Sequence, residues 1–141
     1  MEKHESGIID GYKELAAAII GQATRDLMNA FISGNSRRIH EGQEFFRSDY
    51  AGVLLDKADP EMLITKCRTI AREVKAFEMQ LFAANQKDKA EVLSIVCAVS
   101  DGALCYGHKH MKRNRFIFKS TKKIILEEMK RRGMLKYIYD Y

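Results

Sequence analysis

The sequence predicts a mainly α protein, a compact helical bundle of about five helices in a single domain spanning residues 1–141. Apolar residues recur at steps of three and four along most of the chain, which is the period of an α-helix. With 46% hydrophobic and 30% charged residues, the composition is that of an ordinary folded domain. The 3 cysteines are an odd number at irregular spacing, which favours free core thiols over a disulfide framework.

The first predicted helix covers residues 12–31. Its apolar positions are Tyr12, Ala16, Ile19, Ala23, Leu27 and Phe31. Ser6 or Asp10 can cap its start, and the turn residues at 33–36 end it.

A second helical stretch follows, with Ser36 as its cap and apolar residues from Ile39 to Leu54. Ser48 and Asp49 lie inside it, and a serine followed by an acid either breaks a helix or starts a new one.

The third helix carries the clearest start signal in the chain. Asp59 is a good N-cap, Pro60 suits the first helical position, and Glu61 favours the positive end of the helix dipole. A heptad-like seam follows, made of Leu63, Cys67, Ile70, Val74, Phe77 and Leu81. We expect this seam to pack along the core, with Cys67 as a buried thiol; a coiled-coil homodimer is the alternative.

Residues 90–99 are apolar and often β-branched, so they form a buried helix or, alternatively, a strand. Ser100 to Gly102 reads as a turn. A last helix begins at a Ser120 cap and ends at Gly133. The runs 115–119 and 136–141 resemble short strands that can pair as a small β-ribbon near the C-terminal end.

No motif in the sequence indicates an enzyme, a cofactor or a metal. The chain has no nucleophile elbow, phosphate-binding loop or dinucleotide fingerprint. The residues that most resemble zinc ligands are Cys97, Cys105, His108 and His110, but they lack the two tight pairs typical of structural zinc. We therefore expect a non-enzymatic protein without cofactor or metal, in which these cysteines pack in the core and these histidines are exposed.

Charge is distributed unevenly along the chain. Residues 1–101 contain 13 Lys and Arg against 16 Asp and Glu, whereas residues 102–141 contain 11 against 3. The basic segment 102–141 therefore has a net charge of +8, which suggests an anionic partner.

The cations concentrate further within that segment, and aromatic residues lie among them. The candidate binding residues are Lys109, Lys112, Arg113, Arg115, Phe116, Lys119, Lys122 and Lys123, with Phe118 beside them. Cations that neutralise phosphates next to rings that stack on bases are typical of nucleic-acid grooves. Two alternatives remain: the phenylalanines point into the core while the lysines only solubilise a loop, or the patch docks on an acidic protein surface.

Two stretches of the first half carry a family resemblance. One is residues 15–26, LAAAIIGQATRD; the other is residues 44–50, EFFRSDY, which continues to the segments 54–56 and 60–64. They resemble small, uncharacterised helical proteins encoded by prophages and mobile elements of Gram-positive bacteria. Tyr50 stands where that pattern leads us to expect Trp, and the basic second half has no counterpart in it. The resemblance implies no catalytic residues.

Together, these observations predict a phage or mobile-element binding protein that acts on nucleic acid or on a host nucleoprotein complex, with inhibition of CRISPR-type defence as one such action. The alternative is an assembly protein that self-associates through the Leu63–Leu81 seam, as a homodimer. No apolar run approaches the roughly 20 residues that span a bilayer, and the first residues lack a signal-peptide pattern. We therefore expect no membrane partner and a location in the cytoplasm of the host bacterium.

Overall fold

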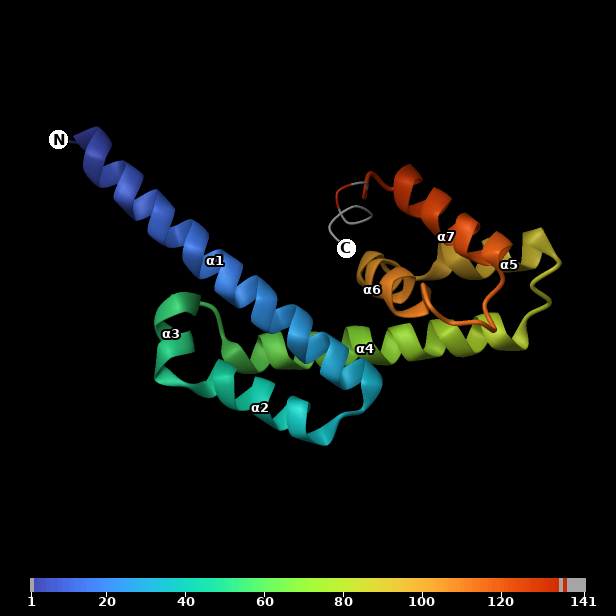
Figure 1. The fold of residues 1–141 in the computed structure, drawn as a ribbon, viewed down its shortest axis with the longest axis horizontal. Coiled ribbons are helices and arrows are strands. Elements are labelled where there is room, and N and C mark those ends of the chain that lie inside the picture. Colours follow the sequence, from blue (N-terminus) through green and yellow to red (C-terminus); the bar gives the residue numbers. More distant parts are fainter. Residues whose placement is uncertain (1, 135, 137–141) are drawn as a thin grey trace. The chain divides into compact units, whose positions relative to one another are not determined.

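The structure is a computed structural model that describes residues 2–134 and 136, with side chains from residue 11 onward. These residues contain seven α-helices and no strand, so the predicted mainly α class is confirmed (Figure 1). None of the described helices is both long enough and apolar enough to cross a bilayer. The chain divides into two compact units, residues 1–69 and 70–141, and the boundary falls inside α4 (Pro60–Ala83). The single domain expected from the sequence stays a prediction.

The first unit contains α1 (Glu2–Ser33), α2 (Ser36–Arg47), α3 (Asp49–Leu55) and the first turns of α4. Since α1 begins at Glu2, the predicted caps Ser6 and Asp10 were wrong and lie inside the helix. Asn35, rather than Ser36, caps α2, because its side chain accepts a hydrogen bond from the Arg38 backbone N–H.

The FFRS sequence at residues 45–48 has a structural role in this unit. Phe46 is buried, and its ring meets that of Phe45 edge-on at 5.7 Å. Arg47 forms a two-point ion pair with Glu61 at 2.6 and 3.1 Å, which joins the end of α2 to the start of α4. Ser48 separates α2 from α3, because its hydroxyl accepts a hydrogen bond from the Ala51 N–H and so caps α3. The second predicted stretch is therefore two helices.

Helix α4 starts as predicted: Pro60 is its first residue, and the Asp59 carboxylate accepts a hydrogen bond from the Glu61 N–H at 3.0 Å. The predicted seam packs into the chain's own core. Cys67, Val74, Phe77 and Leu81 are buried, whereas Leu63 and Ile70 are half-buried. Burial raises the pKa of the Cys67 thiol, as expected for a core cysteine.

The second unit contains the last turns of α4, α5 (Lys89–Ala98), α6 (Asp101–Met111) and α7 (Lys119–Arg131). Asp88 caps α5 by accepting hydrogen bonds from the Ala90 and Glu91 N–H groups, so the strand alternative for 90–99 was wrong. Ser100 does not end a helix in a turn but caps α6, which the sequence did not predict. Because α3 and α6 were not predicted as separate helices, the described residues contain seven helices instead of the predicted five or so.

The predicted β-ribbon was also wrong over the part of the chain that the structure describes. Residues 115–118 form turns and a bend, and Lys119 is already in α7. Of the partner run 136–141, only Lys136 is described, and it is helical. Helix α7 starts one residue before the predicted Ser120 cap, and Gly133, with a φ of 75°, follows its end as expected.

The core of the second unit explains why its helices pack closely. Its buried members are Phe77, Leu81, Val92, Val96, Leu104, Met111, Ile117, Ile125, Met129 and Met134. Gly107 of α6 faces Phe77, and a Cβ at this glycine would lie 3.0 Å from the phenylalanine ring. Because the core reaches Ile117, it also holds the segment between α6 and α7 in place.

Candidate nucleic-acid interface

The segment between α6 and α7, residues 112–118, combines a buried anchor with exposed rings. Ile117 is 2% exposed and belongs to the core, whereas its neighbours Phe116 and Phe118 are 72% and 44% exposed. The alternative in which both phenylalanines point into the core was therefore wrong. One aliphatic side chain holds the segment, and the two rings face outward.

A single amide side chain holds the backbone of this segment. Gln86, in the connection that follows α4, donates from Nε2 to the Phe116 carbonyl at 2.9 Å. Its Oε1 accepts from the Phe118 N–H at 2.7 Å and from the Thr121 hydroxyl at 3.0 Å. Figure 1 shows the orange segment passing beside the last turns of α4. The first two hydrogen bonds fix the backbone on both sides of Ile117, and the third ties Gln86 to the Thr121 side chain of α7.

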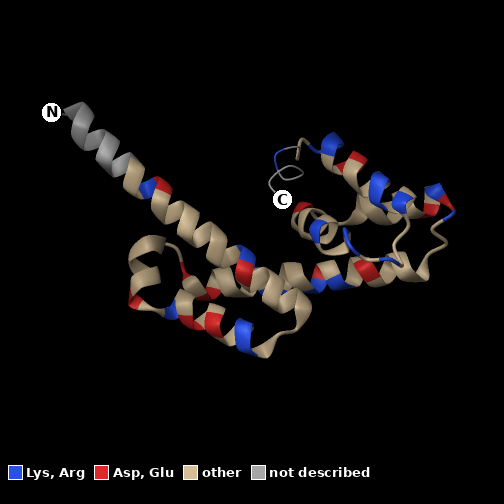
Figure 2. Ribbon diagram, viewed as in Figure 1, with Lys and Arg blue, Asp and Glu red and all other residues tan. Residues whose placement is uncertain are grey.

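Four of the predicted cations are available at this surface. Arg113, Arg115, Lys119 and Lys123 are exposed, and none forms an ion pair or side-chain hydrogen bond with any residue whose side chain the structure describes. Lys119 and Lys123 are four residues apart on α7, so they lie on the same helix face. Figure 2 shows blue segments along the connection and along α7. We call these four cations, with Phe116 and Phe118, the loop interface.

The other three predicted cations have internal contacts. Lys122 is half-buried and donates from Nζ to the Lys112 carbonyl at 3.1 Å. This hydrogen bond joins α7 to the start of the segment that precedes it. Lys109 is half-buried, and both Lys109 and Lys112 interact with other groups. The structure therefore divides the predicted set into four exposed cations without such a contact among the described side chains and three that interact with other groups.

The start of α7 adds a second source of positive potential. Phe118 occupies the N-cap position without a side-chain cap, and the first turn contains no acid. The N-terminus of a helix carries about half a positive charge from its aligned peptide dipoles. Lys119 is the first residue of this helix, so the dipole and the cation favour an anion at the same place.

At the opposite end of α7, the cations Arg131 and Arg132 form ion pairs within the protein, with Glu128. Arg131 bonds the Glu128 carboxylate from Nε and Nη2, both at 2.6 Å, and Arg132 bonds it from Nε at 2.7 Å. These hydrogen bonds, with the Arg131 pair first, lower the pKa of Glu128 to about 2.

Arg132 also binds two other helices. Its guanidinium donates to the Val99 and Cys97 carbonyls at the end of α5, at 2.8 and 3.1 Å, and to Asp101 of α6 at 2.9 Å. The Arg132 side chain is only 14% exposed, so this arginine is a structural residue.

Two residues that shape the loop interface are absent from the sequence-based prediction. Gln86 holds the backbone, and Phe82 of α4 places its ring 6.1 Å from the Phe116 ring. Both lie 30 residues or more before the segment that they contact, so sequence spacing gives no sign of the contact. One feature of the sequence could have indicated that Phe82 is exposed. It directly follows Leu81, the last residue of the apolar seam, and therefore lies on the polar face of α4.

The residues considered as zinc ligands do not converge. No three His, Cys, Asp or Glu side chains form a possible metal site among the described residues. The His110 Nε2 lies 3.1 Å from Glu78 Oε2, and burial, together with nearby Lys112, lowers the pKa of His108. Cys97 is exposed rather than buried, so its predicted core position was wrong.

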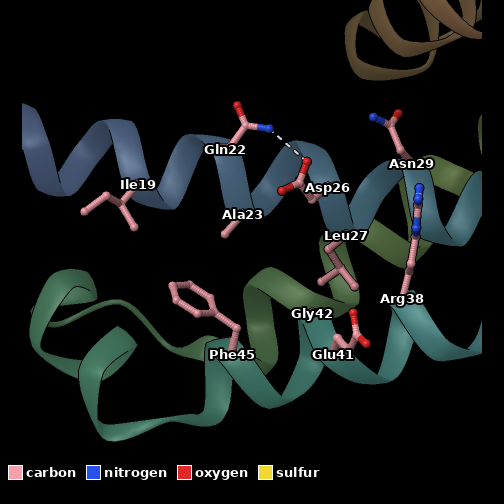
Figure 3. A pocket seen from close by; sticks show the side chains of 10 residues that line it. All are labelled: Ile19, Gln22, Ala23, Asp26, Leu27, Asn29, Arg38, Glu41, Gly42 and Phe45. Carbon is pink, nitrogen blue, oxygen red and sulfur yellow. Dashed lines mark hydrogen bonds between the residues drawn. The ribbon is translucent and has the colours of Figure 1, made fainter.

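The first unit contains a groove of about 710 Å³ between α1 and α2. Ile19, Ala23 and Leu27 point from α1 toward α2, and Phe45 points back toward α1 (Figure 3). Residues of both charges line it, namely the acids Asp26 and Glu41 and the cation Arg38. This mixed lining does not select an anionic polymer, so we do not assign the groove to the loop interface.

Comparisons of the chain with protein-family models, with curated proteins and with solved structures found no match.

Proposed function

We propose that this protein is a non-enzymatic binding protein that holds nucleic acid on the loop interface. The observation that carries the proposal is the contrast around Ile117, which is buried while Phe116, Phe118 and four cations without an ion pair among the described side chains are exposed. Exposed cations release counterions from phosphates, and this release supplies most of the affinity of sequence-independent binding. The uncapped start of α7 favours an anion at the same surface.

A charge-matched pair of variants tests the proposal. The first replaces Arg113, Arg115, Lys119 and Lys123 by Ala; the control replaces Arg38, Lys57, Arg72 and Lys75, which are also exposed. Each variant loses two Arg and two Lys, so the net charge of +5 falls equally and only the position of the charges differs. Binding of labelled oligonucleotides is measured by fluorescence anisotropy from 50 to 200 mM salt.

We expect the loop variant to lose on the order of a hundredfold in affinity at the lowest salt. Its plot of log affinity against log salt should be shallower by about three, since roughly one unit of slope goes with each lost phosphate contact. The control should stay close to wild type. Equal losses in the two variants, or a wild type that binds no oligonucleotide, would contradict direct nucleic-acid binding.

The resemblance of the first half to phage and mobile-element proteins adds a proposal about the setting. In a phage or mobile-element setting, the loop interface would act on a nucleoprotein complex of the host. A CRISPR effector, which holds nucleic acid in a basic channel, is one such complex. The test is a plasmid-interference assay in cells that express the effector, with the two charge variants compared. Interference that is relieved by wild type and the control but not by the loop variant supports this setting, and interference that is unaffected by wild type contradicts it.

A further inference from the structure

The exposed rings of the second unit form a group rather than isolated surface residues. Phe116 is 72% exposed, Phe82 is 44% exposed, and their ring centroids lie 6.1 Å apart with an interplanar angle of 50°. Phe118, two residues beyond Phe116, is 44% exposed. A soluble protein gains nothing in stability from leaving three phenylalanines in water, so a surface of this kind indicates a binding role.

The structure holds these rings in place before any ligand arrives. Gln86 bonds the Phe116 carbonyl and the Phe118 N–H, Ile117 anchors between them in the core, and Asn114 accepts from the Phe116 N–H at 2.9 Å. A segment that is already ordered loses less conformational entropy on binding, which favours affinity.

In the sequence, a cation is the immediate neighbour of two of these three rings. Arg115 directly precedes Phe116, and Lys119 directly follows Phe118. Neither cation has an ion-pair partner among the described side chains. A nucleic acid, with its charged backbone and the flat faces of its bases, can meet both kinds of side chain within a few nucleotides.

We propose that the loop interface selects single-stranded over duplex nucleic acid, because unpaired bases stack on Phe116 and Phe82 while Arg115 and Lys119 meet the backbone. In a duplex the base faces are already stacked on each other, so only the cations would contribute. Each base stacked on an aromatic side chain contributes a factor of about five to more than a hundred in affinity. This inference rests on the proposed function and adds the substrate class.

The experiment compares Phe116→Ala with a matched control, Leu93→Ala. Leu93 is an exposed apolar residue of α5 in the same unit, 49% exposed, and it takes no part in the loop interface. Each variant is titrated with a mixed-sequence single-stranded oligonucleotide, as DNA and as RNA, and with the matching DNA duplex, by fluorescence anisotropy. Phe116→Trp is the conservative variant, since it keeps an aromatic face.

We expect wild type to bind the single strands at least tenfold more tightly than the duplex. Phe116→Ala should lose about tenfold for the single strands and less than twofold for the duplex, Phe116→Trp should restore the preference, and Leu93→Ala should change neither. Circular dichroism checks that all variants keep the helical fold.

The outcomes separate this inference from the proposed function. If wild type binds strand and duplex equally, or Phe116→Ala weakens both alike, stacking is contradicted while charge-driven binding stands. If wild type binds none of the oligonucleotides at 50 mM salt, both proposals fail.

Discussion

The two ends of α7 carry similar numbers of basic residues in sequence but use them in opposite ways. At its start, Lys119 and Lys123, with Arg113 and Arg115 before the helix, are exposed and unpaired among the described side chains. At its end, Arg131 and Arg132 share the Glu128 carboxylate, whose side chain is only 3% exposed. A cluster of cations therefore indicates a binding surface only where no buried acid faces it.

The difference has a physical cause. Glu128 lies on the core side of α7, and a buried carboxylate needs charged hydrogen-bond donors to offset its loss of water. No acid lies in the first turn of α7 or between residues 112 and 123. Arg113, Arg115, Lys119 and Lys123 form no ion pair with the side chains that the structure describes, and we expect them to affect binding but not stability.

The largest effect on stability is expected for Arg132→Ala. This change removes one of the two partners of Glu128 and leaves the carbonyls at the end of α5 without their donor. The unfolding free energy should fall by about 3 kcal/mol, measured by urea denaturation. Arg131→Ala, which changes a mostly exposed side chain, should cost less. Equal losses would show that Arg132 has no special role in joining α5, α6 and α7.

A pH dependence should come from the same site. The pKa of Glu128 in the folded protein is about 2, below its ordinary value of 4.5, so the folded state favours the ionised form. Its contribution to stability is fully present above pH 4.5 and is lost as the pH falls toward 2. We expect Glu128→Gln to destabilise the protein at pH 7 and to differ less from wild type at pH 3. A difference that does not change with pH would exclude this ion pair as the source.

An intermediate effect is expected for Gln86→Ala, which removes the three hydrogen bonds that hold the loop interface. The loss should be about 1–2 kcal/mol, because two of the three groups that lose their partner are exposed and can bond water. Trypsin should also cut faster after Arg113 and Arg115, as shown by mass spectrometry of a time course. Gln80→Ala, an exposed change on α4, is the control, and cutting at the same rate in both variants would contradict the role of Gln86.

The smallest effect on stability is expected for the variant that lacks Arg113, Arg115, Lys119 and Lys123. Since these side chains make no ion pair with the described residues, its unfolding free energy should stay within about 0.5 kcal/mol of wild type. Thermal unfolding by circular dichroism measures this. A loss comparable to that of Arg132→Ala would mean that the two ends of α7 do not differ in the way described above.

The sequence by itself determined the features that depend on near neighbours. The helical period and the start of α4, with Asp59 and Pro60, follow from residues within one turn of each other. The position of the basic segment is also a property of the chain alone. The same local signals were ambiguous at Ser48 and misleading at Ser100, because a serine that ends one helix can equally cap the next.

Only the tertiary structure decided which way the rings and cations of that segment face. The run from Arg115 to Lys119 reads locally as a strand, yet Ile117 enters a core built from four helices while Gln86 holds the backbone on either side. Phe82 meets Phe116 across 34 positions of sequence, and Gln86 bonds Phe116 and Phe118 across 30 positions or more. Burial and these contacts depend on such distant partners, and this is the physical reason that they cannot be obtained from sequence spacing.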